Sequence, residues 1–359
     1  MLKFLRRTLA LGLLSAMLPA GAALALDKPV TIADQGSFFA GGSVKQTAGT
    51  FDYSKPADQS GQTLHGDHAY VFFQKPLKAR KYPLVFLHGA GQSAKTWETT
   101  PDGRDGFQNI FLSRRYSTYL VDQPRRGKAG QSTAAESIPA ATMDQLWFSN
   151  FRLGSWPDFF PGVQVPQDKA ALEQFFRQMT PNTGAFDEKI ISDAMAAVFE
   201  KTGDGILVTH SQGGGPGWYT AIKSEKVKAV VAFEPGSGFI FPEGEVPAPL
   251  ATTSPFGALA GVPVPAADFA KLTQIPIIIY YGDYIPDEPT PEWNKDNWRV
   301  RLIMARLWAD VVNRHGGDAT VVHLPEIGIH GNTHFLFADL NNVQIADHME
   351  KWLHAKNLD

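Results

Sequence analysis

Ser211 lies in the stretch GILVTHSQGGGPGW, residues 205–218, where an apolar run ends in Thr-His-Ser-Gln and meets three glycines and a proline. The apolar run predicts a buried strand and the residues after Ser211 predict a helix. A serine at such a strand-to-helix turn is typical of a nucleophile elbow, here with Thr209 in place of the usual first glycine. The pattern indicates nucleophilic catalysis by Ser211, and an inert serine in a glycine-rich turn is the alternative.

The serine would need two backbone donors for an oxyanion, because a hydroxyl is a weak nucleophile until a base and such donors assist it. One donor is expected at Ala90, in the His-Gly-Ala-Gly turn that ends the apolar run LVFLH. The other is the N–H of Gln212, directly after the nucleophile. His88, which opens the same turn, is expected to shape it rather than to catalyse.

The base is expected to be a histidine after the last predicted strand. His330 and His334 both lie in the stretch EIGIHGNTHF, downstream of the apolar run at 319–325. Each is surrounded by small or apolar residues, so spacing alone leaves both candidates open.

Three carboxylates could complete a triad. Asp283 and Asp287 follow the apolar run at 276–282, where the acid of such a site usually lies, and Glu234 ends the apolar run at 228–234. A carboxylate at the end of a buried run needs a partner, and a catalytic histidine would be one. The residues themselves do not decide among the three.

The elements that would position these groups form an alternating pattern of short apolar, β-rich runs and helix-length stretches. This pattern predicts an α/β fold with a mostly parallel sheet and helices on both faces, and VTIADQGSFFAGG predicts an added antiparallel strand at the N-terminus. The predicted strands are 69–74, 82–88, 116–122, 205–210, 228–234, 276–282 and 319–325, and the predicted helices are 212–224, 297–314 and 341–355.

Residues 136–200 and 239–272 interrupt the alternation and are expected to be cap insertions over the carboxyl edge of the sheet, where open α/β proteins bind ligands. Three aromatic residues of the first insertion, Trp147, Phe148 and Trp156, are candidates to line an apolar substrate pocket. The alternative is that they form the core of the insertion itself.

The first 25 residues combine a cationic start, an apolar centre and a small-residue end, which is typical of a cleavable secretory signal. A membrane anchor is the alternative. The Arg6-Arg7 pair could suit twin-arginine export, but the residues around it fit that signal poorly, so the export route stays open. We expect residues 26–359 to form one periplasmic or secreted domain without stable membrane anchoring. The chain has no cysteine, so core packing alone must hold it.

Composition gives no sign of a nucleic-acid partner, because the net charge is -3 and no basic cluster stands out. No cofactor is expected. The stretch LHGDHAY contains His65, Asp67 and His68, which could ligate a metal, but a turn before a strand explains them better and no metal is expected.

Five motifs in this order give the chain a family resemblance: HGAGQSAKTWETTPDGRDGF, YLVDQPRRGKAG, VTHSQGG, AFEPG and GIHGNTHF. They resemble the exported bacterial esterases of the α/β-hydrolase superfamily, over most of the chain from about Asp67 to the last helix. In that branch the acidic triad member follows strand six. The resemblance implies Ser211 as nucleophile, Glu234 as acid and His334 as base, with His330 as a flanking residue.

The resemblance also implies a homodimer that acts on carboxylic esters of small molecules. It does not identify the substrate, because the insertions that shape the pocket are where such enzymes diverge. An amidase, thioesterase or lactonase would use the same triad, and a non-catalytic ligand binder could share the fold.

Overall fold

The computed structural model describes residues 29–134, 138 and 143–359. The predicted secretory signal lies outside the described residues, as do residues 136, 137 and 139–142 of the first predicted insertion. Among the residues that the structure describes, no helix is both long and apolar enough to cross a membrane.

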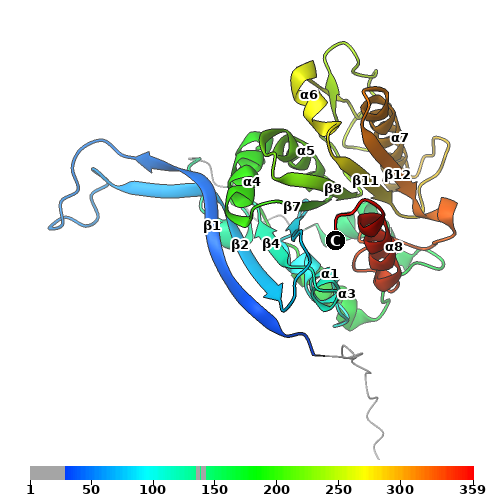
Figure 1. Ribbon diagram of the computed structural model, residues 1–359, viewed down its shortest axis with the longest axis horizontal. Coiled ribbons are helices and arrows are strands. Elements are labelled where there is room, and N and C mark those ends of the chain that lie inside the picture. Colours follow the sequence, from blue (N-terminus) through cyan, green and yellow to red (C-terminus); the bar gives the residue numbers. More distant parts are fainter. Residues whose placement is uncertain (1–28, 135–137, 139–142) are drawn as a thin grey trace, which may run out of the picture.

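An eight-stranded sheet runs through the molecule in the order β1-β2-β4-β3-β7-β8-β11-β12 (Figure 1). The pairs β1–β2 and β2–β4 are antiparallel, and the other neighbours are parallel. The predicted α/β class is therefore confirmed, and each predicted apolar run forms a strand. The strands are β1 (Ile32–Gln46), β2 (Thr63–Pro76), β3 (Leu84–Leu87), β4 (Thr118–Asp122), β7 (Gly205–His210), β8 (Val227–Phe233), β11 (Pro276–Tyr281) and β12 (Asp318–His323).

Helices cover both faces of this sheet (Figure 1). They are α1 (Phe107–Ser113), α2 (Asp144–Asn150), α3 (Lys169–Arg177), α4 (Glu188–Thr202), α5 (Gly214–Lys223), α6 (Ala266–Leu272), α7 (Trp293–Arg314) and α8 (Asn342–Ala355). Short 3-10 turns lie at η1 (Ala94–Trp97), η2 (Gly127–Ala129), η3 (Ser211–Gly213) and η4 (Leu324–Ile327). Two small two-stranded sheets are also present. One pairs β5 (Gly154–Ser155) with β6 (Asp158–Phe159), and the other pairs β9 (Ile240–Pro242) with β10 (Val262–Val264).

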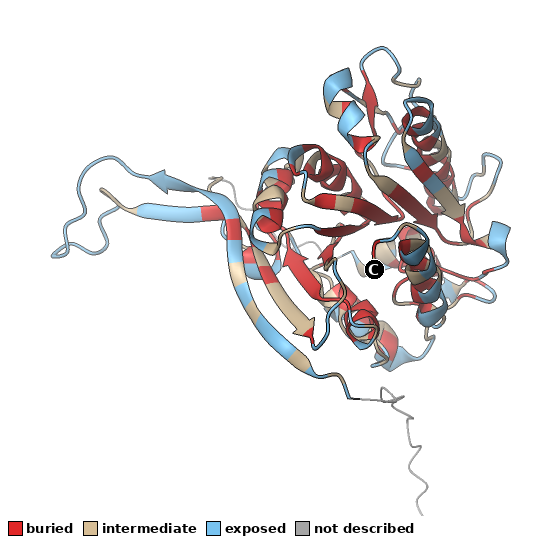
Figure 2. Cartoon of the chain, viewed as in Figure 1, coloured by how far each residue is buried: buried red, intermediate tan, exposed pale blue. Residues whose placement is uncertain are grey.

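Side chains of the central strands alternate between two hydrophobic clusters, one on each face of the sheet. On β11, Ile277 and Ile279 belong to the cluster that also contains residues of α4, α5 and α7, whereas Ile278 and Tyr280 belong to the cluster that contains residues of α1 and α8. Because both faces are buried, the strands read as continuous apolar runs instead of alternating ones (Figure 2). The sheet edge is thereby held rigidly for the residues that follow each strand.

Both predicted insertions contribute residues to the core of the molecule. The first contains α2, β5, β6 and α3, and its last helix, α4, packs in the core against the sheet. The second, with β9, β10 and α6, contributes Ile240 and Phe241 to the same core, and the indole N–H of Trp308 on α7 donates to the carbonyl of Ile240 at 2.8 Å. Residues 47–62 connect β1 to β2 in an arm that extends from the body of the molecule (Figures 1 and 2).

Candidate active site

Ser211 stands at the turn between β7 and α5, as a nucleophile elbow requires. Its φ is +52°, in the left-handed region that residues other than glycine rarely adopt, and it is 7% exposed. Such strain concentrates at functional sites, where the surrounding structure imposes it. The turn therefore presents the hydroxyl at the carboxyl edge of the sheet.

Thr209 replaces the first glycine of the usual elbow, and the structure explains why this is tolerated. The α5 residue beside it is Gly217, and a Cβ at position 217 would lie 2.7 Å from Cγ2 of Thr209. The missing side chain of Gly217 on the helix thus leaves the space that the side chain of Thr209 on the strand occupies. Strand and helix keep the close approach that aims Ser211.

The predicted oxyanion turn lies directly against the serine. A Cβ on Gly89 would lie 2.6 Å from Cβ of Ser211, so only glycine permits this approach. His88 is fully buried; its Nε2 accepts from the N–H of Gln123 at 3.3 Å, and its Nδ1 therefore donates to the carbonyl of Gly89 at 3.1 Å. Burial lowers the pKa of His88 to about 3, helped by the charge of Arg126. His88 is a neutral, structural residue here.

A cavity of about 500 Å³ reaches both predicted oxyanion donors, Ala90 and Gln212. Trp147 on α2 lines it, together with Gly91, Arg126, Ile138, Met143, Asp144, Phe176, Met179, Thr180, Pro181 and Asn182. Phe148 and Trp156 lie elsewhere: Phe148 is fully buried against Trp156 and Phe159, and Trp156 is 43% exposed. Of the three aromatic candidates, the structure brings only Trp147 to this cavity.

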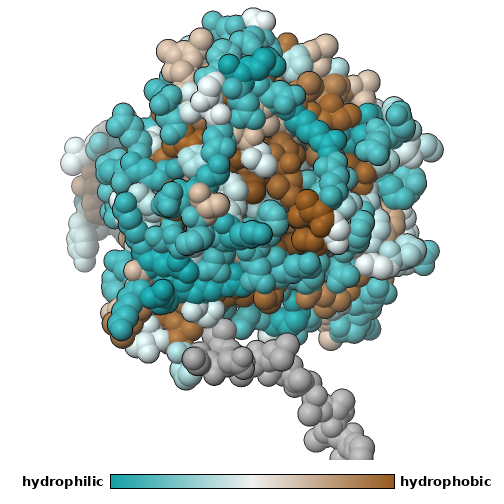
Figure 3. All heavy atoms as spheres, turned by 45° about the vertical axis from the view of Figure 1, so that its right-hand side comes forward, coloured by the Kyte–Doolittle hydropathy of each residue, from teal (hydrophilic) through white to brown (hydrophobic). Residues whose placement is uncertain are grey.

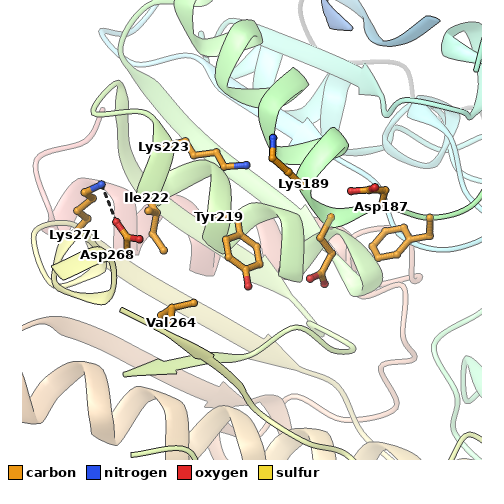
Figure 4. Close-up of a pocket in the computed structure, with 10 residues that line it drawn as sticks. Asp187, Lys189, Tyr219, Ile222, Lys223, Val264, Asp268 and Lys271 are labelled. Carbon is orange, nitrogen blue, oxygen red and sulfur yellow. Dashed lines mark hydrogen bonds and ion pairs between the residues drawn. The ribbon is translucent and has the colours of Figure 1, made fainter. Parts of the chain in front are cut away.

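A larger cavity of about 850 Å³ lies between α4, α5, β10 and α6 (Figure 4). Its lysines are already paired: Lys271 with Asp268 at 3.2 Å, and both Lys189 and Lys223 with Asp193. None of the predicted site residues lines it. Of these two cavities, the smaller one is the one that predicted site residues line, namely Ala90, Gln212 and Trp147. On the face that Figure 3 turns forward, hydrophilic residues predominate and hydrophobic ones gather near the centre.

Of the two late histidines, His334 is the one that the structure buries beside the elbow. Its imidazole centroid lies 4.4 Å from that of His210, the residue before Ser211, and the ring is stacked on Phe151 at 5.0 Å. Nδ1 contacts Oε2 of Glu234 at 2.6 Å. Since a carboxylate only accepts, Nδ1 carries the proton and Nε2 keeps its lone pair.

Nε2 of His334 is buried without a hydrogen-bond partner among the described residues, and the structure records no hydrogen bond from Ser211 to it. Catalytic hydrogen bonds are often long or poorly aligned before substrate binds. The free lone pair is the acceptor that a nucleophilic serine would need.

Glu234 follows β8, the sixth strand in the sheet order, with a φ of +47° and no exposed surface. Its carboxylate contacts His334, accepts from the N–H of Gly282 at 2.6 Å, and is bound by both terminal nitrogens of Arg152. Burial by itself raises the pKa of Glu234, but the charge of Arg152 and the bond to His334 outweigh burial and lower the pKa to about 2. Glu234 is therefore an ionised, buried carboxylate.

The other acid and base candidates lie away from this pair. Asp283 accepts from the N–H groups of Tyr284 at 2.7 Å and Gly331 at 2.8 Å, so it holds the loop that carries His334. His330 is mostly exposed, with Nδ1 3.5 Å from Asp283, and Asp287 is exposed.

The sequence motifs assigned no role beside His334 and Glu234 to two residues of this arrangement. Phe151 and Arg152 are consecutive in the first insertion, just after α2. The carbonyl of Phe151 accepts the N–H of His334 at 3.0 Å, while Arg152 binds Glu234. An arginine inside the aromatic stretch LWFSNFRLGSW was the one available hint.

Asp67, considered above for a metal, is paired with Arg125 at 2.7 Å.

The fold agrees with comparisons to known proteins. The sequence pattern of the alpha/beta hydrolase family matches residues 84–354, and the chain belongs to this family.

A solved structure described as a novel bacterial esterase is 30% identical, with a TM-score of 0.73 over 92% of this chain and 98% of that one. The protein named "Probable secreted lipase phiG" from Fungal sp. (strain ATCC 74256) is 27% identical over 303 residues, 76% of this chain and 81% of its own.

Proposed function

We propose that this protein is a serine carboxylesterase that works through Ser211, His334 and Glu234. The single observation that carries the proposal is the 2.6 Å contact between His334 and Glu234, with Nε2 of the same ring left free beside the strained serine turn. The esterase and lipase relatives support ester hydrolysis as the reaction class.

In the proposed mechanism, the Ser211 oxygen attacks the ester carbonyl while its proton passes to Nε2 of His334. The backbone N–H groups of Ala90 and Gln212 bind the oxyanion of the tetrahedral intermediate. His334 then protonates the leaving alcohol, which leaves an acyl group on the serine. A water then gives a proton to His334 and attacks the acyl carbon, and His334 returns that proton to the serine oxygen as the bond to the acyl group breaks and the acid leaves. Glu234 holds the imidazole tautomer and stabilises the imidazolium.

The substrate is proposed to be a small ester with an apolar group, because the cavity of about 500 Å³ is lined by Trp147, Phe176, Met143 and Met179 near the oxyanion donors. Aromatic rings and thioethers contact apolar groups favourably and adapt to their shape. A series of p-nitrophenyl esters of increasing acyl length would locate the length at which the cavity is full.

Export and dimerisation are further parts of the proposal. The cationic, apolar and small-residue pattern of residues 1–25 and the name of the secreted relative support export. The homodimer implied by the resemblance stays a prediction. N-terminal sequencing of exported protein and light scattering of the purified chain test these two points.

The decisive experiment compares the wild-type protein with Ser211→Ala on p-nitrophenyl butyrate. We expect kcat to fall by a factor on the order of 10⁴ or more, because the nucleophile is lost while binding and the oxyanion donors remain. Thr209→Ser, a mild change in the same buried strand, is the matched control and should keep most of the activity. Equal rates for wild type and Ser211→Ala would refute catalysis by this serine.

A further inference from the structure

Arg152 provides a buried positive charge directly behind the acid–base pair of the site. Its side chain has no exposed surface, and all of its guanidinium nitrogens are used: Nη1 and Nη2 donate to the two oxygens of Glu234, and Nε donates to the carbonyl of Asp283 at 2.8 Å. Fork-to-fork pairing of this kind fixes both the position and the charge of a carboxylate.

The backbone is strained to bring this guanidinium inward. Arg152 has a φ of +59° at the end of α2, a conformation that is normally left to glycine at helix ends. Its guanidinium carbon lies 5.0 Å from the ring centre of Trp298, and the same indole lies 4.2 Å from the imidazole of His334. Packing therefore holds Arg152, Trp298 and His334 as one unit.

The protonation of Glu234 and His334 must be treated as a property of the pair, because the two groups are in contact. With one additional proton, the pair consists either of a carboxylate with imidazolium or of a carboxylic acid that donates to Nδ1. In both arrangements Nε2 carries a hydrogen and cannot accept the proton of Ser211. The pair is active only after that proton has left.

A fixed positive charge beside the pair favours loss of this proton. Resting on the proposed function, we propose that Arg152 is a positioning residue that lowers the proton affinity of the Glu234–His334 pair and so keeps Nε2 available at acidic pH. The guanidinium holds the carboxylate in place, and its charge opposes the formation of imidazolium.

Of the other ionisable groups around the pair, Arg301 acts in the same direction as Arg152 on His334, but less strongly. These groups come from every neighbouring element: His210 at the end of β7, Tyr281 on β11, Arg301 on α7 and Asp339 in the loop after β12. Among these groups, Arg301 is the other cation, and its Nη1 donates to Asn297 rather than to Glu234. Burial lowers the pKa of His334 to about 4, against the attraction of Glu234 and with help from Arg152 and Arg301.

The test compares wild type with Arg152→Met, which removes the charge at similar length, and Arg152→Lys, which keeps it. Two readouts are taken: the pH profile of kcat/KM with p-nitrophenyl butyrate, and an NMR titration of the His334 imidazole, assigned with His334→Gln. We expect Arg152→Met to move the acid limb and the imidazole titration upward by about one to three pH units. Arg152→Lys should keep both near their wild-type positions and lower kcat through its poorer geometry.

A purely structural arginine would lower activity in both variants without moving either titration, and that result would overturn the inference. If Arg152→Met does not fold, Arg152→Gln replaces it, because a neutral amide can still donate to Glu234. If the wild type hydrolyses no ester, the proposed function fails, while the NMR titration of the Arg152 variants still decides the role of the arginine.

Discussion

Replacement of Glu234 by Gln is the change that separates the candidate acids most sharply. The carboxylate faces four donors, two from Arg152, one from Gly282 and one from His334. An amide offers a single acceptor oxygen and turns its own N–H groups toward a donor. In Glu234→Gln, the side chain therefore no longer holds the imidazole of His334 in the tautomer whose Nε2 has a free lone pair. The buried positive charge of Arg152 also loses its negative partner.

The expected effect on rate is large. In serine proteases the corresponding acid-to-amide change lowers kcat about 10⁴-fold, which is about 5 kcal/mol of barrier. Breaking the buried pair should also lower the free energy of unfolding by about 3–5 kcal/mol, because Arg152 stays buried and unpaired. Initial rates on p-nitrophenyl butyrate and urea unfolding measure the two effects.

Asp283→Asn is the matched control. Its two oxygens accept from Tyr284 and Gly331, so the amide keeps one of two loop contacts and kcat should stay within about tenfold of wild type. The double variant Glu234→Gln/Arg152→Met should recover much of the lost stability without recovering activity, because both buried charges are removed together. If Asp283→Asn abolishes turnover and Glu234→Gln does not, the assignment of the acid is wrong.

Three further predictions concern the base and the turn. Because burial lowers the pKa of His334 to about 4, the imidazole is neutral above that pH. We therefore expect kcat/KM to stay level down to about pH 5 and to fall below about pH 4. A pH–rate profile with an acid limb near the ordinary histidine pKa would contradict this prediction. His334→Ala should lose about 10³-fold or more in kcat, whereas His330→Ala should keep most of it, as steady-state rates would show. Gly89→Ala should lower kcat by about 10²-fold, because the added methyl would lie 2.6 Å from Cβ of Ser211 and displace the serine. An unchanged rate in a folded variant would refute the close approach of Gly89 to Ser211.

The central strands of the sheet could be predicted from the sequence because they are buried on both faces. The predicted run at 276–282 agrees with β11 to within one residue, whereas β2 begins six residues before the predicted run at 69–74. The elbow could be located for a related reason, since the glycines after Ser211 serve local contacts, as at Gly217.

The partner of the histidine could not be chosen from the residues alone. Asp283 and Glu234 both end apolar runs, and which carboxylate faces His334 depends on how the loop after β12 folds back. The choice between His330 and His334 depends on the same loop. The family resemblance named Glu234 and His334, and the structure places these two side chains in contact.

Arg152 was missed for a different reason. Its role comes from a segment far from both partners in the chain, and nothing in its local sequence specifies that contact. Trp147 could be proposed as a pocket residue while Phe148 could not be separated from it, because adjacent positions on a short helix such as α2 point to different surroundings.

The dipeptide of Phe151 and Arg152 has a consequence for engineering. It lies close after Trp147 of the cavity, yet the carbonyl of Phe151 accepts from the N–H of His334 and Arg152 binds Glu234. A chimera in which the whole first insertion is replaced by that of a relative, in order to change specificity, would lose these contacts of Phe151 and Arg152. We expect such a chimera to fold but to be inactive. The exchanged segment must therefore end before Phe151, so that α2 can be replaced while Phe151 and Arg152 are kept.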